Sequence, residues 1–320
     1  MIYIYKILTL AAFIIALPVL PLLCLVSTKR RATLLPRLGY GHPDIPVRKR
    51  DSEGNGSKSP RFWIHALSVG EVRSSVPLVR AVKERFPDGL IIFTASTKTG
   101  METARELFQD TAAPLVEQTL YFPLDLGVSI RRTARLIDPD LVVLVETDLW
   151  PNFLHHMKHR RVPVILANAR LSNRSLDGYL KVKPFSRLFF SFLTRILAQT
   201  REDRARYLEL GIAPETVAVT GNIKFDQPFE SMAAASVDQI KKQLNIPTGS
   251  TVVLAGSTHP GEESILADWY NKEASQHPGL CLIIAPRNPD RCTELKREFR
   301  SQQVLSALLS EIESSSAGYF

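Results

Sequence analysis

The alternation of short apolar runs with helical patterns constrains the fold of this chain more than any other feature of its sequence. From residue 61 onward, apolar runs of strand length alternate with segments whose apolar residues recur at helical spacing. This alternation is typical of an α/β fold, in which helices cover both faces of a parallel sheet. The predicted strands are 61–67, 90–95, 141–146, 163–167 and 195–199, and the predicted helices are 72–86, 99–108, 127–137, 151–160 and 201–210.

A second α/β series begins near residue 236. Two Rossmann-like domains in one chain describe the GT-B-like architecture of many nucleotide-sugar transferases. We therefore expect a Rossmann-like domain at 61–220 and a partial second one at 221–320. The second is expected to be incomplete, because two strands are fewer than a doubly wound domain normally has. Its predicted elements are helix 236–244, strand 251–255, helix 261–275, strand 280–285 and helix 289–300.

The N-terminus carries an apolar stretch long enough to enter a membrane. Residues 7–26 hold no charge over 20 residues, which can cross a hydrocarbon layer of ~30 Å. Lys29, Arg30 and Arg31 follow it, and this basic flank favours a cytoplasmic location for the bulk of the chain.

We expect 1–30 to be a membrane anchor and 31–60 a linker. A shallowly embedded helix is the alternative, because Pro18 and Pro21 interrupt the apolar run. A cleaved signal peptide is disfavoured by the length of the run and by the basic cluster after it.

The charge balance favours anionic partners. The chain has 40 basic and 32 acidic residues, a net charge of +8. The excess is spread along the chain and no nucleic-acid-binding motif occurs, so nucleic acid is not predicted as a partner.

Ligands of open parallel sheets bind beyond the carboxyl ends of the strands, and Glu71 follows the first predicted strand. One interpretation makes Glu71 a general base at this edge. The other makes it an acidic residue that stabilises the start of a helix through the helix dipole. The residues alone slightly favour the second.

Polar residues also follow the next three strands. Ser96, Thr97 and Lys98 suit an anionic ligand at a helix start, although an ordinary N-cap fits equally well. Glu146 ends the third strand in an acidic cluster that favours a functional role. Arg170 follows the fourth strand, where it is interpreted as a phosphate ligand or as part of a solvated turn.

The two strands of the second domain end in similar residues. Ser257 and Thr258 lie beside glycines at the entry to a helix, which makes a plausible phosphate cradle. Arg287 ends the next strand and can pair with a phosphate or a carboxylate.

No metal site is predicted. Asp138 and Asp140 spell a DxD sequence, but they precede their strand and so belong to the opposite edge of the sheet. We interpret them as a helix-to-strand turn. The spacing of Cys24, Cys281 and Cys292 gives no plausible metal ligand set.

An ordered series of segments resembles the bacterial 3-deoxy-D-manno-octulosonic acid (Kdo) transferases of lipopolysaccharide assembly. The series covers nearly the whole chain after the linker, and as a set it is highly specific. It consists of HALSVGEV at 65–72, TASTKTG at 94–100, YFPLD at 121–125, ETDLWPN at 146–152, ANARLSNRS at 167–175, VTGNIKFD at 219–226, AGSTHPGEE at 255–263 and APRNPDR at 285–291.

The resemblance implies an inverting GT-B enzyme at the cytoplasmic face of the bacterial inner membrane. The implied donor is CMP-Kdo, the implied acceptor is a lipid A precursor, and no metal or cofactor is needed. Glu71 matches the family's general base, which reverses the preference for a capping role. Glu146 is implied to position the acceptor or basic partners, and Lys224, Ser257, Thr258 and Arg287 to bind CMP-Kdo.

One departure from the family concerns the end of the chain. Family members continue with further strands and a Gly-Gly-x-Asn motif followed by a glutamate, which helps to hold the nucleotide, and this sequence lacks it. We therefore expect weak or no transfer by this chain alone. A non-catalytic membrane-bound binder of lipid A precursors is the alternative. An oxidoreductase is disfavoured because no GxGxxG follows a strand.

Overall fold

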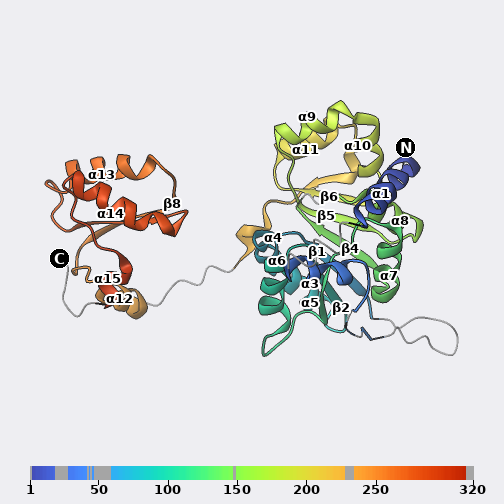
Figure 1. The fold of residues 1–320 in the computed structure, drawn as a ribbon, viewed down its shortest axis with the longest axis horizontal. Helices are drawn as coiled ribbons and strands as arrows, with labels where there is room; N and C mark the ends of the chain where they lie inside the picture. The colour runs from blue at the N-terminus through green and yellow to red at the C-terminus, as the bar shows by residue number, and fades with distance from the viewer. Residues whose placement is uncertain are drawn as a thin grey trace. The chain divides into compact units, whose positions relative to one another are not determined.

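The computed structural model divides into two compact units, Met1–Pro228 and Phe229–Phe320, called here the N-terminal and C-terminal units (Figure 1). The residues that the structure describes are 2–18, 28–41, 43, 45–46, 59–146, 149–227 and 234–314.

A seven-stranded parallel sheet organises the N-terminal unit. The strand order β3-β2-β1-β4-β5-β6-β7 extends the arrangement of dinucleotide-binding folds. The five predicted strands are confirmed. The four-residue strand β3 was not predicted, since its sequence QTLY is too short and too polar to form an apolar run. The strands are β1 Arg61–Ala66, β2 Leu90–Ala95, β3 Gln118–Tyr121, β4 Leu141–Val145, β5 Val164–Ala169, β6 Arg195–Ala198 and β7 Val217–Val219.

Helices connect these strands at nearly the predicted positions. The single helix predicted over 72–86 is divided at Ser75, because Pro77 has no N–H to continue the hydrogen-bond ladder of the preceding turn. The helices are α1 Ile2–Ala16, α3 Thr28–Arg37, α4 Val69–Ser74, α5 Val76–Arg85, α6 Lys98–Ala104, α7 Gly127–Ile137, α8 Pro151–His159, α9 Asn173–Lys181, α10 Lys183–Phe190 and α11 Arg201–Glu209, with short helical turns at Arg105–Gln109, Pro214–Thr216 and Ile223–Asp226 (η3).

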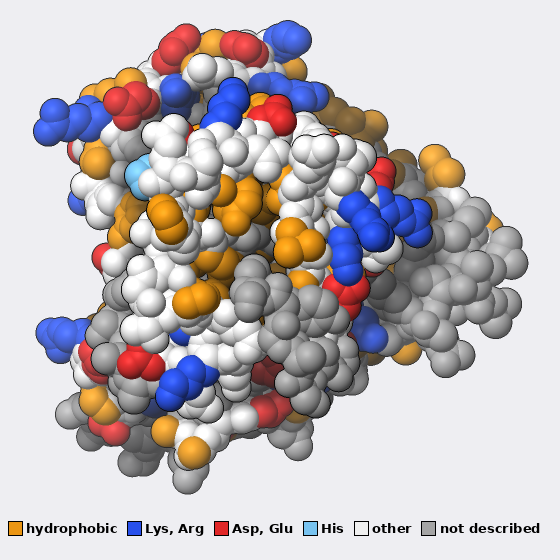
Figure 2. All heavy atoms as spheres, turned by 90° about the vertical axis from the view of Figure 1, so that its left-hand side faces the viewer, with side chains coloured by type: hydrophobic (Ala, Val, Ile, Leu, Met, Phe, Trp, Pro, Cys, Tyr) orange, Lys and Arg blue, Asp and Glu red, His pale blue; other side chains and the backbone are white. Residues whose placement is uncertain are grey.

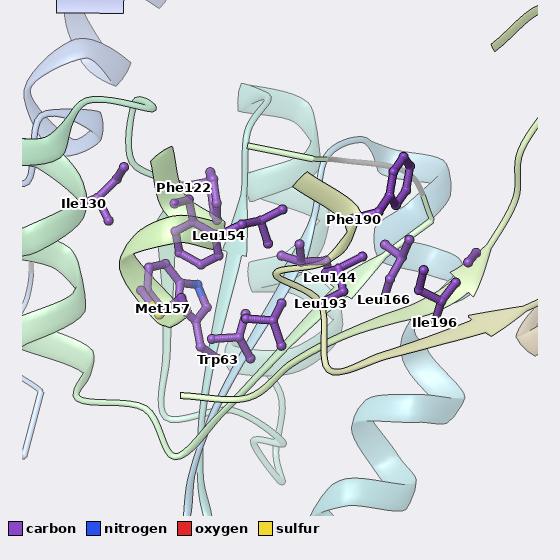
Figure 3. Close-up of a cluster of buried hydrophobic side chains, with 14 of the residues drawn as sticks. Trp63, Phe122, Ile130, Leu144, Leu154, Met157, Leu166, Phe190, Leu193 and Ile196 are labelled. Carbon is purple, nitrogen blue, oxygen red and sulfur yellow. The ribbon is translucent and has the colours of Figure 1, made fainter. Parts of the chain in front are cut away.

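Each face of the sheet has its own hydrophobic cluster, because successive side chains of a strand point to opposite faces. Trp63 of β1 packs with residues of α7 and α8, including Leu154 and Met157 (Figure 3). Its neighbour Ile64 packs on the other face with residues of α4, α5 and α6. The two clusters bury the central strands completely, so only the loops at the strand ends remain available for chemistry.

The N-terminal helix α1 packs on α8. The Tyr5 hydroxyl donates to Asp125 Oδ2 at 3.1 Å, and Asn152 Nδ2 donates to Thr9 Oγ1 at 3.1 Å. Several large apolar side chains of α1 stay exposed, among them Ile7 at 66% and Ile15 at 77%.

None of the described helices combines the length and the apolar character that crossing a bilayer requires. Of the span predicted at 7–26, residues 19–26 lie outside the described residues.

The C-terminal unit holds the predicted helices and two parallel strands, β8 Thr251–Thr258 and β9 Leu280–Pro286. Its buried hydrophobic cluster consists of Ala267, Leu295 and Phe299. Leu254 of β8 is 67% exposed. Figure 2 faces this unit and shows hydrophobic side chains reaching the surface among charged ones. Its helices are α12 Ala234–Gln243, α13 Glu262–Glu273, α14 Cys292–Ser301 and α15 Leu309–Ser314, with a short helical turn at Pro289–Arg291.

Candidate active site

Glu71 lies in the first turn of α4, at the carboxyl end of β1. Its Oε2 accepts a hydrogen bond from the Leu67 N–H at 2.6 Å, and its Oε1 accepts one from the Ser68 hydroxyl at 3.2 Å. The carboxylate therefore reaches back to the loop before its helix, much as the N3 glutamate of a capping box does, although the backbone donor is Leu67 and not the N-cap residue Ser68. This contact agrees with both interpretations of Glu71 from the sequence. It stabilises the start of a helix, and it also fixes the direction of a partly exposed carboxylate at the sheet edge, as a general base requires.

The loop after β2 packs against the loop that carries Glu71. The Thr97 hydroxyl accepts from the Gly100 N–H at 3.0 Å and lies 3.3 Å from the Leu67 carbonyl oxygen, to which it donates. A Cβ on Gly100 would come within 2.7 Å of Thr97 Oγ1, so the close approach requires glycine. Thr97 is thus the N-cap of α6, and its hydroxyl supports the Glu71 loop.

The other two polar residues of this loop differ in their contacts. Ser96 Oγ is buried and has no hydrogen-bond partner among the described residues. Lys98 is 3.6 Å from Glu102, and both side chains are about half exposed. Ser96 therefore has an unused hydroxyl near the sheet edge, whereas Lys98 takes part in an ion pair at the surface.

Glu146 and Lys224 meet at the same edge, although the resemblance implied different roles for them. Glu146 follows β4 with a φ of 69°, a backbone conformation that costs a non-glycine residue of order 1–3 kcal/mol. Its Oε1 lies 3.1 Å from Lys224 Nζ. Lys224 belongs to η3, which is part of the N-terminal unit. The structure thus couples a residue predicted on the acceptor side to one predicted to bind the donor.

Two amide side chains hold η3 on this edge. Asn168 is the second-last residue of β5 and has a φ of 54°, and its Oδ1 accepts from the Ile223 N–H at 3.2 Å. Gln227 Nε2 donates to the Arg73 carbonyl oxygen at 2.8 Å, which ties the same segment to α4. Sequence reasoning did not single out either residue. The only available signal was Asn168, because asparagine is the residue that most readily replaces glycine at positive φ.

The DxD residues form the predicted helix-to-strand turn. Asp138 is the left-handed C-cap of α7 and pairs with Arg160 at 2.7 Å. Asp140 Oδ2 accepts from the Arg61 N–H at 2.8 Å at the amino end of β1. Across the described ranges, no group of three or more His, Cys, Asp or Glu residues is placed to hold a metal ion.

Arg170 and Arg287 are both exposed. Arg170 follows β5 in the N-terminal unit, and Arg287 follows β9 in the C-terminal unit. The Arg287 backbone N–H donates to the Thr258 carbonyl oxygen at 2.9 Å, so the ends of β8 and β9 are held together.

In the C-terminal unit, Thr258 has an internal partner that the sequence did not reveal. Its hydroxyl donates to Glu263 Oε1 at 2.9 Å, and Arg291 Nη1 donates to the same oxygen at 2.8 Å. Glu263 is only 1% exposed. Ser257, by contrast, is exposed and has a φ of 59°. Of these two hydroxyls, only that of Ser257 faces solvent.

Known proteins match most of this chain in sequence. The family described as 3-Deoxy-D-manno-octulosonic-acid transferase (kdotransferase) matches residues 34–227. The 3-deoxy-D-manno-octulosonic acid transferase of Haemophilus influenzae is 36% identical over 240 residues, which are 74% of this chain and 55% of that protein. The one from Chlamydophila psittaci is 29% identical over 310 residues, which are 97% of this chain and 67% of that protein. The chain thus spans between about half and two thirds of the length of these relatives.

Solved structures agree on the fold. A UDP-GlcNAc 2-epimerase from Neisseria meningitidis superposes with a TM-score of 0.54 at 17% identity, over 78% of this chain and 73% of its own. A glycosyltransferase from Rickettsia africae superposes with a TM-score of 0.52 at 12% identity, over 79% and 68%. At such identities the likeness concerns the fold alone, and the fold is the α/β, GT-B-like one that the sequence predicted.

Proposed function

This chain belongs to the Kdo transferase family, and we propose that it is an inverting glycosyltransferase of lipopolysaccharide assembly. The donor is CMP-Kdo, and the acceptor is a hydroxyl group of a lipid A precursor. The observation that carries the proposal is the position of Glu71, a partly exposed and oriented carboxylate at the carboxyl end of β1 inside the segment that matches the family.

In this proposal Glu71 is the general base. It takes the proton from the acceptor hydroxyl while that oxygen attacks the anomeric carbon of Kdo, and CMP leaves from the opposite face. The hydrogen bond from the Leu67 N–H holds Oε2, so Oε1 is the oxygen that can exchange its longer contact with Ser68 for the acceptor. Proton transfer to such a positioned group contributes roughly 10²–10⁴-fold to a rate.

Glu146 and Lys224 are proposed to act together. The ion pair keeps the Lys224 ammonium at the sheet edge, where its positive charge can offset the phosphate charge of the leaving CMP without a metal. Ser96, Thr97, Lys98 and Arg170 belong to the acceptor side. Ser257, Thr258 and Arg287 contribute to the donor side, and Thr258 acts there through its backbone because its hydroxyl is bonded to Glu263.

We further propose that residues 1–30 anchor the chain to the cytoplasmic face of the bacterial inner membrane. The exposed apolar side chains of α1 support this, together with the basic residues at 29–31. A surface-bound enzyme would meet a lipid acceptor in the plane of the membrane.

The experiment compares Glu71→Gln with wild type in a Kdo transfer assay using CMP-Kdo and a lipid A precursor. Glutamine keeps an oxygen that can accept from the Leu67 N–H, so α4 should fold normally while the base is lost. We expect transfer to fall by roughly 10²-fold or more. Glu84→Gln is the matched control, since Glu84 is exposed on α5, and it should transfer normally. Transfer by Glu71→Gln at the wild-type rate contradicts the proposal.

A further inference from the structure

A cavity of about 270 Å³ lies between α1, α7 and α8 of the N-terminal unit. Its lining does not include Glu71, and it lies on the opposite face of the sheet from the helix that carries Glu71. Helices α7 and α8 cover the face of the sheet that carries Trp63, whereas α4 packs on the opposite face. Among the residues that line the cavity, the sequence analysis reached only Asn152, as the end of the segment ETDLWPN at 146–152. His155 and His159 stand four apart on a predicted helix and so share one face of it.

Among the described residues, the ionisable residues of the cavity wall are all basic. Lys6 enters from α1 and Arg131 from α7, while α8 contributes His155, His156 and His159. Among the described residues, no Asp or Glu lines the cavity. Asp125 lies beside its wall, but its carboxylate accepts from the Asn152 and Phe153 N–H groups and from the Tyr5 hydroxyl, so Lys6 and Arg131 leave the lining itself positive and suited to an anion.

Burial and the nearby positive charges lower the pKa of two of these histidines. Burial lowers the pKa of His156 from its ordinary 6.5 to about 4, and the positive charges of Arg160, Arg131 and Lys6 lower it further in the same direction. Burial and Lys6 do the same to His155, whose pKa is also about 4. These histidines are therefore neutral at pH 7, where they donate or accept hydrogen bonds without adding charge.

The start of α7 opens into the same cavity. Gly127 is its first residue and lines the wall, and the N-cap residue Leu126 supplies no side-chain cap. No atom lies within 4 Å of the point where a Cβ on Gly127 would be. The first N–H groups of an eleven-residue helix have no partner within the helix, and such groups bind anions well.

A buried side chain in the wall points independently to a ligand. Asn152 is 4% exposed, and its Nδ2 donates to Thr9 Oγ1 and to the Asp125 carbonyl oxygen. Its Oδ1 accepts no hydrogen bond from any described residue. His156 Nε2 is likewise buried without a described partner. Buried polar atoms are normally satisfied, so a ligand that carries a hydroxyl as well as negative charge fits this wall.

We propose that this cavity binds a phosphoryl group, with Lys6, Arg131 and the N–H groups at the start of α7 around its oxygens and a P–OH or neighbouring hydroxyl donating to Asn152 Oδ1. The phosphoryl group is either free or carried by a lipid. Leu10 of α1 lines the cavity and is 54% exposed, so the apolar surface of α1 continues from the cavity mouth.

The test measures binding of inorganic phosphate by titration calorimetry, and binding to phosphatidylcholine vesicles with and without phosphatidic acid by flotation. Lys6→Gln combined with Arg131→Gln removes both permanent charges and should weaken phosphate binding by roughly tenfold or more. The matched control combines Arg135→Gln on α7 with Lys158→Gln on α8, which removes the same charge from exposed residues outside the cavity. This control should bind phosphate like wild type.

A second variant keeps the charges. Gly127→Ile fills the open space at the start of α7, where glycine has no required backbone conformation, and should block phosphate with the fold intact. Phosphate binding with no added affinity for phosphatidic acid identifies a free phosphate as the ligand. Stronger flotation with phosphatidic acid, lost in Lys6→Gln/Arg131→Gln but kept in the control, identifies a lipid.

The proposal is overturned if wild type binds neither ligand, or if the cavity variants bind as well as the control. Because the site does not involve Glu71, Glu71→Gln should bind phosphate normally, which separates this proposal from the proposed transferase activity.

Discussion

The N-terminal and C-terminal units start from the same sequence pattern and reach different degrees of burial. In the N-terminal unit, seven strands and two layers of helices bury both faces of the sheet. In the C-terminal unit, two strands leave Leu254 largely exposed and the hydrophobic cluster has three buried members. The comparison teaches that alternating strands and helices predict elements, whereas burial depends on how many neighbouring strands each element has.

The units also differ in what stabilises them. The aromatic rings of Trp63, Phe122 and Phe153 pack at centroid distances of 4.9–5.8 Å in the N-terminal unit. In the C-terminal unit, Oε1 of the nearly inaccessible Glu263 accepts hydrogen bonds from Thr258 and Arg291. One unit therefore depends mainly on apolar packing, and the other depends strongly on a buried polar contact.

The largest effect should come from the aromatic packing. Phe153→Ala removes a completely buried ring and should lower the free energy of unfolding of the N-terminal unit by about 3–5 kcal/mol. Leu254→Ala should change the free energy of unfolding of the C-terminal unit by less than about 0.5 kcal/mol, since its side chain is exposed. Urea unfolding is followed by tryptophan fluorescence, through Trp63 and Trp150 in a Trp269→Phe background for the N-terminal unit and through Trp269 for the C-terminal unit. Equal effects of the two substitutions would remove the contrast between the units.

The buried ion pair should give the next largest effect. Arg291→Ala leaves the Glu263 carboxylate buried with one partner fewer and should destabilise the C-terminal unit by about 3 kcal/mol. Arg287→Ala is the control, because its side chain is exposed in the same unit. Urea unfolding of the C-terminal unit is followed through the fluorescence of Trp269 in α13. Adding Glu263→Gln to Arg291→Ala should restore part of the lost stability, and no restoration would mean that the charge is not the cause.

The smallest effect should be a different response of the units to acid. Burial, reinforced by nearby basic groups, lowers the pKa of His155 and His156 to about 4. Below pH 6.5, the ordinary pKa of histidine, the unfolded chain therefore binds more protons than the folded chain. The free energy of unfolding of the N-terminal unit should fall as the pH drops from 7 towards 4, by on the order of 1 kcal/mol per histidine after screening by solvent. His156→Gln should flatten this dependence, and the exposed His277→Gln should not.

Glu263 sets the acid response of the C-terminal unit. Burial alone would raise its pKa, but hydrogen bonds from its own backbone N–H, Thr258 and Arg291 outweigh burial and lower it. The stability from this lowered pKa is present above the ordinary value of 4.5 and is lost as the pH falls further. The C-terminal unit should therefore hold its stability between pH 7 and 5 while the N-terminal unit loses some. Parallel losses in that range would contradict the assignment.

Much of the candidate site was predictable from residues at strand ends. Glu71 and Glu146 were placed correctly because β1 and β4 are long apolar runs whose ends are easy to locate. The pairing of Glu146 with Lys224 was not predictable, since 78 residues separate them and η3 has no periodic pattern. The partner of Thr258 was missed for a similar reason, because Glu263 looked like an ordinary acid at a helix start.

The sequence by itself determined the α/β class, the positions of most strands and helices, and the family, because periodicity and motifs are local properties of the chain. The tertiary structure decided which of these local features meet. Lys6, Arg131 and Asn152 line one cavity because the crossover from β3 to β4 and the docking of α1 bring three helices together. Side-chain contacts across such distances depend on strand order and helix packing, which no single segment encodes.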